Sequence, residues 1–120
     1  MERPDKNDPD YAVKVYFLYR EFIHYAYFDT GLAKPSVGRK FIPDSIKYEL
    51  EHGKLNGIHM RDLNRLKSSL NIAFVMFSNK DHFQNVKQEL LRLKSETIQV
   101  KSFAKMTEIV LKGRELVRLD

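Results

Sequence analysis

Apolar side chains recur along most of this chain at the spacing of three and four residues that marks one face of an α-helix. The first such segment begins near Asp10, which can cap a helix, and ends by Gly31, which tolerates left-handed backbone. Its polar side carries Lys14, Arg20, Glu21 and His24, with Phe17, Tyr25 and Phe28 among them. Its apolar half, which we expect to be buried, consists of Ala12, Val15, Tyr16, Leu18, Tyr19, Phe22, Ile23, Ala26 and Tyr27.

Two further helices are predicted in the middle of the chain, after a stretch, LAKPSVGRKF, that is typical of a loop. The second helix covers residues 43–53, since the fixed φ of Pro43 suits a first turn and Gly53 suits an end. Its apolar stack is Ile42, Ile46 and Leu50. The third helix covers residues 58–77, and its expected core stripe is Leu63, Leu66, Leu70, Ala73, Phe74 and Phe77.

The last third of the chain predicts two more helices. Ser78 followed by Asp81 resembles a capping arrangement for a fourth helix, whose apolar line is Phe83, Val86, Leu90 and Leu93. A fifth helix over residues 101–119 is weakened by Gly113 in its interior and presents Phe103, Met106, Val110 and Val117. No segment shows the convincing alternation of a half-buried strand, so the predicted fold class is all-α.

Composition sets the broad class of the protein. A chain of 120 residues with 42% apolar content is expected to form one domain with one core. Residues 1–10 are expected to be a polar tail, and no run of about eighteen apolar residues predicts a transmembrane segment. The chain contains no cysteine, which excludes disulfides and thiolate metal sites. Its net charge of +5 favours acidic partners such as nucleic acid, an acidic protein face or an anionic membrane.

Signals for catalysis and for metal binding are weak. The chain has neither a Gly-x-Ser-x-Gly elbow nor a cysteine nucleophile, and KPSVGRK lacks the glycine spacing of a phosphate loop. No histidine pairs with carboxylates at the spacing of a metal site; they are His24, His52, His59 and His82. We therefore expect a protein that is not an enzyme and holds no metal.

Nucleic-acid binding is an alternative function. The second and third helices with the turn between them resemble a helix-turn-helix, whose outward side would carry Arg61, Asn64, Arg65 and Lys67. The turn HGKLNG is longer than that motif requires, and Asp62 lies among the basic residues. A solvated charged face is the simpler interpretation of the same residues.

The first helix also carries a family resemblance. AVKVYFLYREFI, residues 12–23, resembles the signature of the LYR motif family of small helical mitochondrial proteins, with Leu18-Tyr19-Arg20 at the position of the Leu-Tyr-Arg. A second family element, Ile-Arg-x-x-Phe on a later helix, is similar to IKYELEHGK, where Lys47 replaces the arginine and Leu50 replaces the phenylalanine. The resemblance covers roughly residues 11–77.

The resemblance implies a three-helix antiparallel LYR-type bundle over residues 11–77 that docks the acidic mitochondrial acyl carrier protein. The acyl-phosphopantetheine of that carrier would insert between the helices, so the protein has no cofactor of its own. It implies a non-catalytic subunit or assembly factor of respiratory complex I, of the iron–sulfur machinery or of the mitochondrial ribosome. The location would be the mitochondrial matrix or the matrix side of the inner membrane.

The same resemblance implies the site residues. Those expected to line the acyl slot are Leu18, Tyr19, Phe22, Ile46, Leu50, Leu63 and Phe74. Those expected to grip the carrier are Arg20, Lys47, Arg61 and Arg65. The last third of the chain has no counterpart in the family; we expect the helical extension over residues 78–120 to contact other subunits of the assembly, and its candidate residues lie within residues 79–120, namely Lys80, Lys87, Lys94, Lys101, Lys105 and Lys112. An alternative stays open for the motif itself, because Leu18 and Tyr19 also suit plain core positions and Arg20 a solvated one.

Overall fold

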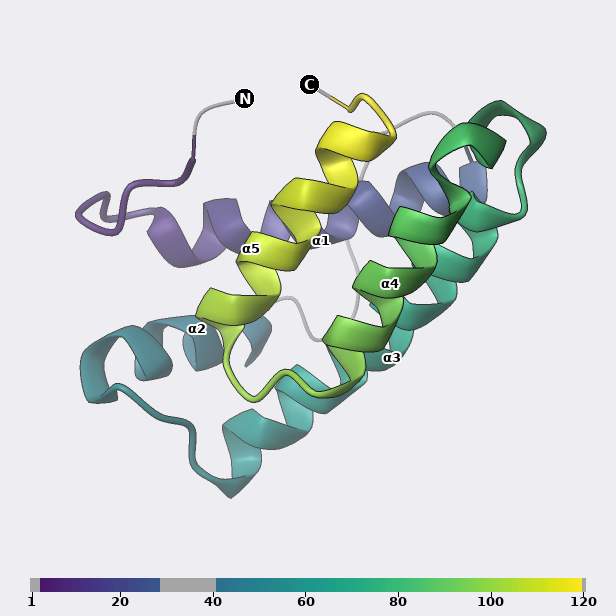
Figure 1. Cartoon of the computed structure of the whole chain (residues 1–120). Coiled ribbons are helices and arrows are strands. Elements are labelled where there is room, and N and C mark those ends of the chain that lie inside the picture. The colour runs from purple at the N-terminus through teal and green to yellow at the C-terminus, as the bar shows by residue number, and fades with distance from the viewer. Residues whose placement is uncertain (1–2, 29–40, 120) are drawn as a thin grey trace.

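Helices account for all the regular structure in residues 3–28 and 41–119, the part of the chain that this computed structural model describes (Figure 1). In chain order they are α1 (Tyr11–Phe28), α2 (Phe41–His52), α3 (Gly57–Ser78), the 3₁₀ helix η1 (Asp81–Val86), α4 (Lys87–Ile98) and α5 (Phe103–Leu116). The predicted all-α class is confirmed. The end predicted for the first helix at residues 29–31 and the loop over residues 32–40 lie outside the described residues.

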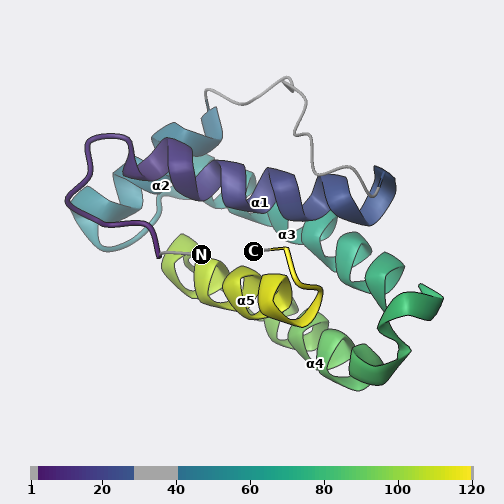
Figure 2. The same ribbon diagram turned by 90° about the horizontal axis from the view of Figure 1, so that it is seen from above.

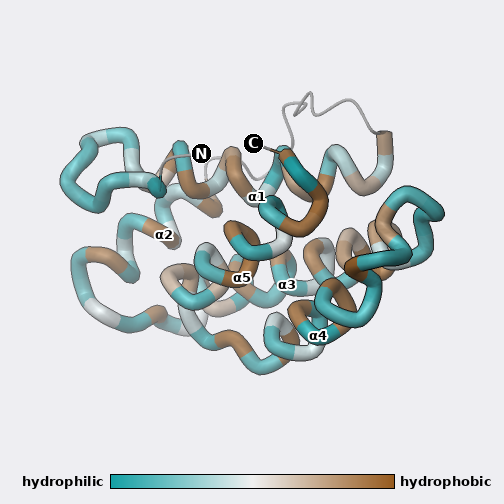
Figure 3. The backbone as a smooth tube through the Cα atoms, turned by 45° about the horizontal axis from the view of Figure 1, so that its top comes forward, coloured by the Kyte–Doolittle hydropathy of each residue, from teal (hydrophilic) through white to brown (hydrophobic). Residues whose placement is uncertain are grey.

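Four of these helices form a closed ring around the core. α1 packs on α3, α3 on α4, α4 on α5 and α5 on α1, while α2 packs on α1 and α3 (Figure 1, Figure 2). A helix with neighbours on two sides needs a wide apolar face, and the apolar half of the wheel predicted for the first helix supplies one. Figure 3 shows this division, with hydrophobic stretches on the helices and hydrophilic turns between them.

Aromatic side chains from the neighbouring helices α1 and α3 meet at the centre of the ring. The ring of Phe22 on α1 lies 5.0 Å from that of Phe74 and 4.9 Å from that of Phe77, both on α3. The C-terminal helices add Leu90, Leu93, Phe103, Met106 and Val110 to the same buried cluster. The described residues after α3 thus form the helices η1, α4 and α5, and α4 and α5 complete the core that α1 and α3 begin.

Gly113 lets α5 approach this centre closely. A Cβ atom at this position would lie 2.9 Å from the ring of Phe74 and 3.0 Å from the ring of Phe22. Both rings are fully buried, so neither has room to move away. The glycine that the sequence marks as a weak point of the fifth helix is thus the residue that allows the helix to pack.

Helix boundaries lie within three residues of the predicted ones except at one junction; α2 begins two residues before Pro43, and α5 is shorter than the predicted 101–119. α2 ends at His52, where Gly53 takes the left-handed backbone with φ +76°, and α3 covers the predicted segment. The capping arrangement predicted from Ser78 is wrong. Ser78 belongs to the last turn of α3, and its hydroxyl donates to the Val75 carbonyl at 2.7 Å. The next helix is the short η1, whose N-cap residue Lys80 makes no capping bond with its side chain.

Burial follows the predicted stripes with three exceptions. Tyr27, in the last turn of α1, is 47% exposed, although Ala26 before it belongs to the core. Leu50 is 44% exposed on α2, whereas its stack partners Ile42 and Ile46 are buried. His24, on the side of α1 expected to be polar, is buried.

Candidate functional site

The residues expected to line an acyl slot are divided between the core and α2. Ile46 and Leu50 lie on α2, and Ile46 also belongs to the core cluster, together with Tyr19, Phe22, Leu63 and Phe74 of α1 and α3, whereas Leu18 of α1 is not part of that cluster. The residues on α1 and α3 are buried, and they are Leu18, Tyr19, Phe22, Leu63 and Phe74. Because α5 packs directly on α1, an acyl chain could reach these core residues only by displacing α5.

Tyr19 is tied to α5 by hydrogen bonds as well as by packing. Its hydroxyl lies 3.0 Å from the Phe103 carbonyl oxygen, to which it donates, and 2.5 Å from the Thr107 hydroxyl oxygen. Burial raises the pKa of the Tyr19 phenol far above its ordinary value, so the hydroxyl keeps its proton at any physiological pH. The tyrosine of the Leu-Tyr-Arg segment is thus a neutral donor that fixes α1 against α5.

The cations expected to grip a carrier do not converge on one point. The Arg20 guanidinium lies 5.6 Å from the centre of the Tyr16 ring and 5.8 Å from that of Phe17. Arg61 and Arg65 are exposed one turn apart on α3. Lys47 is exposed on α2, on the side away from Ser45, which contacts α3, because residues two apart on a helix point in roughly opposite directions.

A pocket of about 330 Å³ lies between α2 and the first residues of α1 and α5. Ile46 and Leu50 line it from α2, Tyr11 from the start of α1, and Phe103 from the start of α5. It therefore brings together two of the residues expected in an acyl site, although the expected slot lay elsewhere. Lys6, from the segment before α1, also lines the pocket.

Glu49 fixes the floor of this pocket. Its carboxylate accepts the backbone N–H of Phe103 at 2.7 Å and that of Ala104 at 3.0 Å, so a side chain of α2 caps the first turn of α5. The Ser102 hydroxyl accepts the N–H of Lys105 at 3.1 Å and completes the cap. Burial first, and then the negative charge of Glu49, raise the pKa of Tyr11 beside it.

Several lysines are close in sequence to residues that line the pocket. In addition to Lys6, which lines it, four exposed lysines stand next in sequence to lining residues, and we call all five the lysine rim: Lys6, Lys47, Lys54, Lys101 and Lys105. Lys105 forms an ion pair with Glu108 at 3.6 Å, and because both side chains are exposed this pair contributes little to stability. Exposed acids also stand next in sequence to lining residues, namely Asp5, Asp10 and Glu51, so with Glu49 inside the pocket the charge at this end is mixed and only slightly positive.

Sequence reasoning found only part of this site. It named Ile46, Leu50 and Lys47, but it missed Tyr11 and Glu49. The hydrogen bond from the Phe103 N–H to Glu49 joins residues 54 apart in the chain, and a local sequence pattern cannot predict a contact between such distant residues. The apolar stack of the second helix was the one signal that pointed to this place.

A second polar cluster joins α2 to α3. The Ser45 hydroxyl oxygen lies 2.6 Å from His59 Nδ1, contacts the Asp62 carboxylate and lies 3.1 Å from the Phe41 carbonyl. Ser45 is fully buried and stands between the histidine and the aspartate, whereas a nucleophilic triad places the histidine in the middle. This geometry suits a structural link between two helices.

The described residues contain neither a cluster of metal ligands nor a membrane-spanning helix. Within residues 3–28 and 41–119, no three metal-ligating side chains gather closely enough to hold an ion. None of the helices in that part of the chain is long and apolar enough to cross a bilayer. Comparisons of the chain with models of protein families, with curated proteins and with solved structures found no match.

Proposed function

We propose that this protein is a non-catalytic helical adaptor that docks an acidic, acylated acyl carrier protein within a mitochondrial assembly. The acyl-phosphopantetheine arm of the carrier enters the pocket between α1, α2 and α5. The observation that carries the proposal is that Ile46 and Leu50, the residues of the element resembling the LYR family's second motif, line this pocket together with Phe103.

The pocket has a polar part, formed by Lys6, Glu49 and Ser102, and an apolar part that suits an apolar chain of limited length. Its walls of Ile46, Leu50 and Phe103 are apolar, and each methylene removed from water there contributes about 0.8 kcal/mol. A volume of about 330 Å³ stands near the lower end of the range for ligand pockets. The arm with a short acyl chain fits this size better than a long chain.

The lysine rim supports an acidic partner. Positive charge at the mouth of the pocket speeds the encounter with an acidic surface and orients it, even where each pair adds little affinity. Arg61 and Arg65 lie on α3, which contributes no residue to the pocket lining. In this proposal the rim, and not these two arginines, receives the carrier.

The Leu-Tyr-Arg segment acts indirectly in this proposal. Tyr19 holds α5 through the Phe103 carbonyl, and Phe103 forms one wall of the pocket. The motif thus fixes the position of a wall and does not touch the arm itself.

The first test is intact mass spectrometry of the protein purified natively. We expect a co-purifying acidic carrier protein whose mass includes an acylated phosphopantetheine. The absence of any such carrier would count against the proposal. If the protein is then retained on RNA or DNA with a steep loss at higher salt, the alternative, a basic helical nucleic-acid-binding protein using the exposed Arg61 and Arg65, takes its place.

A pair of variants tests the pocket. Leu50→Gln puts a polar group at the mouth without removing a good helix former, and Ile72→Gln makes the same change at a similarly exposed site on α3. Losing part of one buried leucine should weaken binding of purified acylated carrier by roughly tenfold. Calorimetric titration should show this loss for Leu50→Gln and unchanged affinity for Ile72→Gln. Equal affinity of the two variants would exclude this pocket as the entry point.

A further inference from the structure

The segment before α1, residues 3–10, lies beside α5, and we call it the strap (Figure 2). It is polar along its length, as Figure 3 shows at the N-terminal end of the chain. Its residues form turns and no helix, so the strap has no regular structure that would hold it rigidly.

The strap borders two neighbouring hollows along α5. Lys6 lines the pocket of about 330 Å³ described above. Arg3, Pro4 and Lys6 also line a second hollow of about 120 Å³, whose opposite side is formed by α5. Tyr11 and Ala104 belong to both linings, so the two hollows adjoin where the strap lies over α5.

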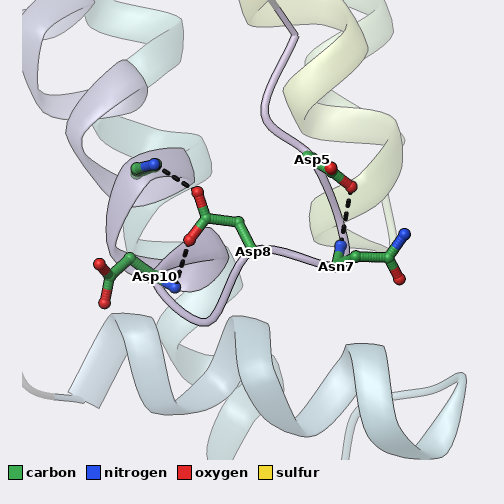
Figure 4. Close-up of polar contacts among 5 residues, drawn as sticks. Asp5, Asn7, Asp8 and Asp10 are labelled. Carbon is green, nitrogen blue, oxygen red and sulfur yellow. Dashed lines mark hydrogen bonds and ion pairs between the residues drawn. The ribbon is translucent and has the colours of Figure 1, made fainter.

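The strap is anchored to α1 and not to the helix that it covers. Asp5 accepts the N–H of Asn7 at 2.9 Å, and Asp8 accepts the N–H of Asp10 at 2.8 Å and pairs with Lys14 of α1 (Figure 4). Within the described part of the chain, the strap's hydrogen bonds run to its own residues and to α1. Its approach to α5 therefore depends on packing and on the Asp8–Lys14 anchor.

We propose that the strap is a displaceable cover of the pocket, so that a ligand enters fully only when residues 3–10 swing away from α5. This inference rests on the proposed function, since it adds a regulation to the same pocket. The strap carries two exposed cations, Arg3 and Lys6, against three acids, Asp5, Asp8 and Asp10, so its release depends on competition for the Asp8–Lys14 pair and not on a net attraction to an acidic partner.

The anchor is intact at neutral pH. The hydrogen bond from Lys14, and after it that from the Asp10 amide, lower the pKa of Asp8, and the bond to Asp8 raises the pKa of Lys14. Because its pKa is lowered in the folded state, the Asp8 carboxylate stays charged at pH values below the usual range for an aspartate. The anchor is therefore lost only when the pH falls below that range. Release near neutral pH must therefore come from competition by another charged surface.

A neutral apolar dye tests the cover without any carrier protein. The probe is N-phenyl-1-naphthylamine, whose fluorescence rises in apolar surroundings and whose lack of charge removes any direct effect of Lys6. Asp8→Ala in the full chain removes the anchor, and Glu89→Ala removes an exposed acid on α4, far from the strap, as the control. We expect Asp8→Ala to bind the dye about two- to fivefold more tightly than the natural chain, and Glu89→Ala to match it.

The other outcomes decide against the cover. Unchanged or weaker binding by Asp8→Ala would mean that the strap is a fixed wall of the pocket. Dye binding by none of the three proteins would also overturn the inference, because the pocket would then admit nothing when the anchor is lost. Thermal denaturation must show that Asp8→Ala remains folded. Since the dye replaces the carrier, a negative result here leaves carrier docking untouched, and an absent carrier leaves this result untouched.

Discussion

Tyr19 shows how a residue can belong to a recognition motif and still act inside the fold. Its ring stacks 6.5 Å from that of Phe103, and its hydroxyl reaches the Phe103 carbonyl and the Thr107 hydroxyl of α5. A buried hydroxyl without partners would cost free energy, so the two hydrogen-bond partners on α5 make a tyrosine tolerable at the centre. Its phenol therefore specifies which turn of α5 faces α1.

Replacing Tyr19 by phenylalanine should lower the free energy of unfolding by about 1 kcal/mol, because the ring stays and only the hydroxyl bonds are lost. Thr107 keeps its own bond to the Phe103 carbonyl at 2.8 Å, which limits the loss. Urea denaturation measures the change. Tyr25→Phe, at a half-buried site on the same helix, is the control and should leave stability nearly unchanged. A Tyr19→Phe chain as stable as the natural one would remove the specific role assigned to this hydroxyl.

α5 is the helix on which both the core and the pocket depend. Glu49 of α2 caps its first turn, and near its end Arg114 pairs with Glu21 of α1 at 2.7 Å. Arg114 is 1% exposed whereas Glu21 is 39% exposed, so breaking the pair would leave a buried guanidinium without its counter-charge. Side chains of other helices thus position α5 at both ends, and Gly113 lets it sit deep between them.

Gly113→Ala should therefore destabilise the protein although alanine favours helices. The gain in helix propensity is about 1 kcal/mol, whereas forcing a methyl group against two buried rings costs about 1–3 kcal/mol. We expect a net loss in chemical denaturation of the variant. Gly57→Ala is the matched control, because a Cβ there meets no atom within 4 Å, and it should be neutral or stabilising. A stabilised Gly113→Ala would show that Phe22 and Phe74 can move apart.

At the scale of the whole molecule, the sequence predicts the helices better than it predicts the contacts between them. The stripe through Phe22 and that through Phe74 are local patterns, and both are buried as expected. The pairing of α5 with α1, and the bond from Glu49 to α5, join distant parts of the chain and leave no periodic trace. For the same reason the sequence named Leu50 as a site residue but expected it in a slot that α5 covers.

The predicted division of the chain into residues 11–77 and 78–120 can be tested with fragments of the protein. A fragment of residues 1–77 would lack α4 and α5, and Phe22 and Phe74 would lose the cover that Gly113 brings close to them. Each large apolar side chain left exposed forgoes about 1.5–3 kcal/mol, which a small domain of marginal stability does not tolerate. We expect the fragment to show no cooperative thermal transition by circular dichroism, and adding a separate fragment of residues 78–120 to restore one. A sharp transition in the shorter fragment alone would instead mean that the first three helices form an independent bundle, and that α5 can leave them to expose the buried residues of the Leu-Tyr-Arg helix.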